Sequence, residues 1–226
     1  IRPIRDLTVM PLHQIHEAPA HVERRFALFD LGFRPFYWLA AVFAALSIPL
    51  WALQFSGLLP RAYLAGPVWH AHEMVFGFTL AVIVGFLFTA GRNWSNQPTP
   101  TGATLAGLAL LWIAGRVLVL TPLAGWAALV NIAFPLAAAV SLAIPFLRSG
   151  SRRNYFFVVM LGLMALASGF VHLSQMGNIS LPPWPGIQVA LAGVLLVLCV
   201  MGSRGSPPSP SQAVHGAAAR RHGGLQ

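Results

Sequence analysis

Six long apolar stretches, separated by short polar segments, dominate the pattern of hydrophobic and polar positions along this chain. Each is close to the roughly 20 residues that a helix needs to cross the hydrocarbon core of a bilayer. Backbone polar groups left unpaired in lipid are costly, so each stretch is predicted to be a helix and not a strand. The pattern predicts an all-α fold, a polytopic transmembrane bundle with about six spans at residues 36–59, 70–90, 103–120, 125–147, 155–175 and 186–201.

Two polar segments flank this transmembrane domain, which is expected to cover residues 36–201. Residues 1–35 carry His and Arg and lack the short apolar core and small-residue cleavage site of a signal peptide. They are expected to form a cytoplasmic N-terminal segment. Residues 202–226 are rich in Gly, Ser, Pro and Arg and offer too little apolar surface to fold, so they are expected to form a disordered basic tail.

Composition supports the membrane class. Of the 226 residues, 57% are hydrophobic and only 8% are charged, and the mean hydropathy is +0.70. The formal net charge is +9, and all 14 basic residues are arginine. In a soluble protein such a charge would suggest nucleic-acid binding. Here most of the arginines lie between the apolar stretches. We interpret them as topology signals and lipid headgroup contacts, so the expected partner is a lipid bilayer and no nucleic acid.

The arginines also predict an orientation. With the N-terminus in the cytoplasm, twelve of the 14 arginines fall on the cytoplasmic side, which leaves Arg61 in an outer loop and Arg116 inside the third span. The excess of positive charge in cytoplasmic loops makes this the expected arrangement.

Six polar side chains interrupt the apolar spans or lie at their ends. Ionisable residues at membrane depth are expensive and are functional candidates by default. The second span begins, and the fifth ends, at the outer surface, so their polar residues should share one depth with Arg116 of the third span. The side chains expected together near the outer face are His70, His72, Glu73, Arg116 and His172, with Asn131 of the fourth span just beneath them.

Three histidines at one level suit a metal centre, because imidazole binds haem iron, copper and zinc. On a helix, His70 and His72 lie about 200° apart and should face different neighbours, whereas His70 and Met74 share one face. The preferred arrangement pairs one of these two histidines with His172 across a haem and leaves the other for copper. Arg116 would then neutralise a haem propionate or pair with Glu73. From these residues alone, a structural or transport role stays open beside metal binding.

Five segments of the chain resemble the NnrS family in order and spacing. They are ALFDLGFRPF (27–36), WHAHEMVFG (69–77), GR (115–116), RNYF (153–156) and VHL (171–173). The resemblance implies a polytopic protein of the bacterial inner membrane that carries haem and copper and supports tolerance of nitric oxide, its expected ligand, during denitrification or nitrosative stress. Carried over by position, it makes His70, His72 and His172 the ligand candidates.

The chain departs from the family pattern in two ways. The resemblance ends near Gly202 and covers the N-terminal half of a family that has about twice as many helices, and the tail resembles a frameshifted reading. A missing C-terminal half or a homo-oligomer is therefore an expected partner. A small-solute transporter or channel, and a truncated fragment without activity, are the alternative functions. Whether the protein is an enzyme stays undecided, because no motif of a soluble catalytic site occurs.

Overall fold

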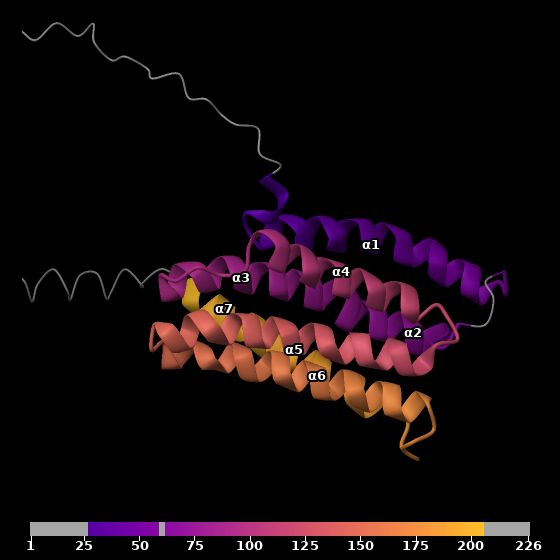
Figure 1. The fold of residues 1–226 in the computed structure, drawn as a ribbon. Helices are drawn as coiled ribbons and strands as arrows, with labels where there is room; N and C mark the ends of the chain where they lie inside the picture. Colours follow the sequence, from indigo (N-terminus) through magenta and orange to yellow (C-terminus); the bar gives the residue numbers. More distant parts are fainter. Residues whose placement is uncertain (1–26, 59–61, 206–226) are drawn as a thin grey trace, which may run out of the picture.

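The computed structural model describes residues 27–58 and 62–205, which form an antiparallel bundle of helices (Figure 1). Its elements, in chain order, are η1 (Ala27–Phe29), α1 (Phe33–Phe55), α2 (Gly66–His72), the π-helix η2 (Glu73–Thr79), α3 (Leu80–Ser95), α4 (Gly102–Leu118), α5 (Ala124–Arg148), η3 (Arg152–Asn154), α6 (Tyr155–Gln175) and α7 (Trp184–Gly205). No strand occurs in these described ranges. The predicted all-α fold is confirmed.

All six predicted spans have a helical counterpart. Five helical stretches are long and apolar enough to cross a membrane: Phe33–Phe55, Gly66–Ser95, Ala124–Arg148, Arg152–Gln175 and Trp184–Ser203. The sixth, Gly102–Leu118, has 17 residues, which at about 1.5 Å of rise per residue is near the lower limit for a span. The predicted N-terminal segment (residues 1–35) and the predicted tail (residues 202–226) lie mostly outside the described ranges.

The second span differs from a single regular helix. It is built from α2, η2 and α3 in direct succession, so a π-helical turn replaces α-helix from Glu73 to Thr79. Such π-helical turns occur mostly as short interruptions of α-helices, often at functional sites. Hydropathy could not reveal this turn, because it reports how apolar a segment is and not the hydrogen-bond pattern of its helix.

Two apolar clusters hold the bundle together. The larger one joins α1, η2, α3, α4, α5, α6 and α7 and contains fully buried rings such as Phe36, Phe88 and Phe157. The smaller one comprises Leu64, Trp69, Val119 and Ala127. It lies at the end of the bundle where α2 begins and α6 ends, which we call the imidazole end because His72 and His172 lie there. Many large apolar side chains remain exposed, as suits a surface that faces lipid.

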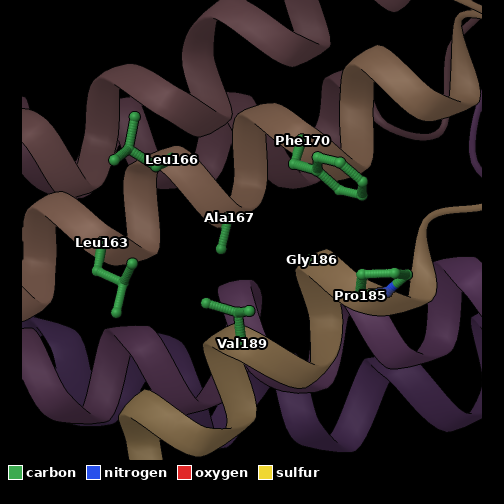
Figure 2. Close-up of a pocket in the computed structure, with 7 residues that line it drawn as sticks. All are labelled: Leu163, Leu166, Ala167, Phe170, Pro185, Gly186 and Val189. Atoms are coloured by element: carbon green, nitrogen blue, oxygen red, sulfur yellow. The ribbon is translucent and has the colours of Figure 1, made fainter. Parts of the chain in front are cut away.

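Helices α6 and α7 approach closely through small residues (Figure 2). A Cβ atom added to Gly186 would lie 2.8 Å from Val171 Cγ2 and 2.9 Å from the carbonyl oxygen of Ala167. Beside this contact, an apolar groove of about 260 Å³ runs between the two helices. Close packing of backbones through small residues is a main source of helix association in membranes.

Gly186→Ala should therefore destabilise the bundle. The new methyl group meets backbone as well as side-chain atoms, and overpacking of this kind costs about 1–3 kcal/mol. Gly162→Ala is the matched control, because a Cβ at Gly162 meets nothing within 4 Å and alanine is the better helix former. Thermal unfolding in detergent, followed by circular dichroism, measures both. Equal unfolding midpoints would contradict the close α6–α7 contact.

Candidate metal centre

The π-helix η2 is anchored to α4 by two side chains. Trp112 Nε1 donates to the carbonyl oxygen of Gly77 at 3.0 Å, and Arg116 Nη1 donates to that of Phe76 at 2.9 Å. Trp112 and Arg116 lie one turn apart on α4, and the guanidinium carbon is 5.4 Å from the centre of the indole ring. A neighbouring helix can satisfy the carbonyl oxygens of an irregular turn in this way. The two hydrogen bonds therefore hold η2 against α4.

A buried ion pair joins η2 to α4 as well. Arg116 Nε lies 2.8 Å from Glu73 Oε2, and the two side chains are 8% and 0% exposed. Arg116 Nη2 donates to Asn131 Oδ1 on α5, and Asn131 Nδ2 donates to the carbonyl oxygen of Ala127 at 2.8 Å. Nη1 and Nη2 thus each have a hydrogen-bond acceptor, and Nε takes part in the ion pair. Of the two roles expected for Arg116, the structure shows the pairing with Glu73.

Two glycines leave room for this network. A Cβ on Gly77 would lie 2.9 Å from Glu73 Oε2 and 3.1 Å from Arg116 Nη1. A Cβ on Gly115 would lie 3.1 Å from Asn131 Oδ1. Larger residues at either position would push the charged or amide groups apart.

His72 is fully buried and is oriented by the neighbouring carboxylate. Its Nδ1 lies 2.8 Å from Glu73 Oε1. Because the carboxylate paired with Arg116 can only accept, Nδ1 carries the proton and the neutral ring presents a lone pair at Nε2. This Nε2 is buried and has no hydrogen-bond partner. A carboxylate on the far nitrogen is the usual support of a metal-binding histidine.

His172 has a different support. The Tyr63 ring stacks on it, with centroids 5.7 Å apart and planes at 12°, and the Tyr63 hydroxyl donates to the His172 carbonyl oxygen at 2.9 Å. The same hydroxyl lies 3.4 Å from His172 Nδ1. Burial raises the pKa of Tyr63 to about 12, so the phenol keeps its proton at physiological pH. His172 Nε2, too, is buried without a partner.

The two rings meet directly. The centroids of His72 and His172 are 5.0 Å apart, and the planes cross at 74°, edge to face. Residues 100 positions apart in the chain thus form one imidazole pair, with two buried Nε2 atoms that lack partners. Buried polar atoms are nearly always hydrogen-bonded, and an exception requires an explanation. The contacts agree with the predicted gathering of His72, Glu73, Arg116 and His172, with Asn131 next to them.

His70 and Met74 lie outside this pair. His70 stacks on Trp51 of α1, with centroids 4.6 Å apart, and its Nδ1 is buried without a partner. As the rotation of about 200° predicts, it faces a different neighbour from His72. Met74 belongs to η2 and packs against the larger apolar cluster. The pairing of His70 with Met74 stays a prediction.

The donor atoms suit a metal ion better than a haem between the rings. Neutral imidazole nitrogens are good ligands for copper, zinc or iron, and both Nε2 lone pairs are buried and without partners. The rings of the imidazole pair are in contact edge to face, so a planar macrocycle does not fit between them as they lie. Within the described ranges, no group of three or more His, Cys, Asp or Glu side chains could hold a metal ion.

Sequence reasoning missed two residues near the imidazole pair. Tyr63 lies in the connection before α2 and resembles an ordinary interfacial aromatic residue. Ser168 is fully buried, one turn before His172 on α6, and its hydroxyl has no partner. The spacing of four residues from a candidate ligand was the available signal for Ser168. For Tyr63 the sequence offers no comparable signal.

Comparison with known proteins gave one match. A family model described as NnrS protein matches residues 27–226. No curated protein and no solved structure matches the chain. The match runs beyond Gly202, where the resemblance was expected to end.

Glu73→Gln should strongly destabilise the protein, because it leaves the Arg116 guanidinium buried without its counterion. Breaking one partner of a buried pair costs about 3–5 kcal/mol. The double variant Glu73→Gln/Arg116→Met should lose less than the two single variants combined, and the exposed Arg148→Met is the control. Unfolding free energies in detergent test this cycle. Additive losses would show that the two charges do not interact.

Gly77→Ala should also destabilise the fold, by about 1–3 kcal/mol, because the added methyl overlaps the ion pair. Gly107→Ala on α4 is the control, since a Cβ there meets nothing within 4 Å. The unfolding midpoints of both variants in detergent provide the measurement. A Gly77→Ala protein as stable as the control would refute the tight fit of the ion pair beneath η2.

Proposed function

Because the chain belongs to the NnrS family, we propose that it is a bacterial inner-membrane protein of the nitric oxide response that binds copper and haem, with its N-terminus in the cytoplasm. The observation that carries the proposal is the imidazole pair, whose two rings are in contact and whose two Nε2 atoms are buried without partners. The five long apolar helices support a membrane location, and the arginine distribution supports the orientation.

Copper is the metal that we assign to the imidazole pair. Copper accepts imidazole nitrogen readily and tops the affinity order of divalent first-row metals. The chain's own residues orient the ligands, because the Glu73 carboxylate accepts from His72 Nδ1 and is itself paired with Arg116. A bound copper ion would supply a redox-active centre at which nitric oxide can bind. Both histidines are fully buried, which limits the access of water to this centre.

Haem requires a different position in this proposal. The contact between the two rings leaves no space for a macrocycle between them. In the described part of the chain, His70 is the imidazole that remains at this end, and its buried Nδ1 without a partner makes it our candidate for haem iron. The partner ligand would then come from another helix, from a second copy or from a further segment of polypeptide.

A solute pathway is less well supported. Such a pathway would be lined by polar groups that bind the solute. Here Arg116 instead binds Glu73, Asn131 and a backbone carbonyl, which leaves its guanidinium nitrogens engaged inside the protein.

The proposal predicts the metal content of single variants. We expect the detergent-purified chain from copper- and haem-replete cells to contain copper and to show a Soret band. His72→Ala and His172→Ala should lose the copper, because each removes one of two donors, whereas His70→Ala should keep copper and lose the Soret band. Metal analysis and oxidised and dithionite-reduced spectra measure both. A colourless, metal-free wild-type protein would contradict the proposed function.

A further inference from the structure

We propose that Tyr63 is a positioning residue that fixes the orientation and tautomer of His172, so that the imidazole pair presents two lone pairs to a single copper(I) ion. The part of this proposal that concerns copper rests on the function proposed above. Tyr63 contacts both the backbone and the ring of His172.

Tyr63 is itself held in place from two sides. Its backbone N–H donates to the carbonyl oxygen of Thr121 at 3.1 Å, and the next N–H, of Leu64, donates to that of Val119 at 3.3 Å. These bonds attach the segment before α2 to the connection between α4 and α5. The ring then lies parallel to His172 at the end of α6. Tyr63 thus connects three parts of the imidazole end.

The hydrogen-bond directions around Tyr63 follow from the available protons. A phenol has one proton, and Tyr63 donates it to the His172 carbonyl oxygen, which can only accept. Toward His172 Nδ1, at 3.4 Å, the phenol oxygen is therefore the acceptor. Nδ1 carries the proton of the neutral ring, and Nε2 has the lone pair. Glu73 imposes the same tautomer on His72.

Glu73 and Tyr63 thus favour the same tautomer, with the proton on Nδ1, in two histidines that lie on different helical segments. Both Nε2 atoms are acceptors, both are buried, and neither has a donor. A buried acceptor without a partner is unfavourable, and one cation bound to both lone pairs would remove both penalties. Two nitrogen donors in contacting rings match a metal ion of low coordination number. Of the imidazole-binding metals, copper(I) fits such a site best.

The tautomers can be measured without any metal. Nitrogen-15 NMR of histidine-labelled, metal-free full-length protein in detergent should show both His72 and His172 protonated at Nδ1. Tyr63→Phe, which keeps the ring but removes the hydroxyl, should change the His172 tautomer signals and leave those of His72. Tyr155→Phe, at the opposite end of α6, is the matched control. A wild-type His172 protonated at Nε2 would overturn the proposal, whether or not Tyr63→Phe folds.

Copper(I) affinity provides the second test. In competition with a chromophoric chelator, Tyr63→Phe should bind copper(I) about 10–100-fold more weakly than the wild type, as expected for loss of a residue that orients a ligand. Tyr155→Phe should bind as the wild type does. Equal affinity of Tyr63→Phe and wild type overturns the role of Tyr63 alone. A wild type that binds no copper(I) contradicts the proposed function, while the tautomer measurement still decides the positioning role.

Discussion

The buried ion pair between Glu73 and Arg116 is the constraint on which the imidazole end depends. Two charges inside an apolar bundle are tolerated only when they pair and when their remaining hydrogen-bonding groups are satisfied. Here the carboxylate also binds His72, and the guanidinium also binds Asn131 and a carbonyl of η2. If any one of these side chains is removed, the others remain buried in an apolar environment without a hydrogen-bond or charge partner. The network therefore fixes the relative positions of the second span, α4 and α5.

The irregular turn and the glycines are explained by this constraint. The π-helix η2 begins at Glu73 itself, and its carbonyl oxygens receive Trp112 and Arg116 from α4. Gly77 lies where any Cβ would collide with the ion pair. Deviations from regular helix are costly in a membrane unless neighbouring groups re-satisfy the backbone, and α4 supplies those groups. The same network holds the His72 ring against His172, so the fold of the second span and the candidate site have one physical cause.

Much of the site could be predicted from sequence because a bilayer limits the directions and lengths that its helices can have. Helices that alternate in direction and share a fixed thickness place His72, Arg116 and His172 at one depth without any knowledge of packing. The separation of His70 from His72 also followed from helix geometry alone, and the structure agrees. Tyr63 could not be found in this way, because a tyrosine in a short connection carries no sign of its partner. The contact of Tyr63 with His172 spans 109 positions of the chain.

The sequence by itself determined the class of the protein, the number and approximate limits of its apolar helices, and which polar residues gather at one end of the bundle. It could do so because hydropathy along the chain reports how each segment partitions into lipid. Tertiary structure alone decided which histidines meet, that Arg116 binds Glu73, and that a π-turn separates α2 from α3. These features depend on the rotation of each helix about its axis and on contacts with its neighbours. Hydropathy does not encode that rotation, because it is set by the close packing of side chains between helices.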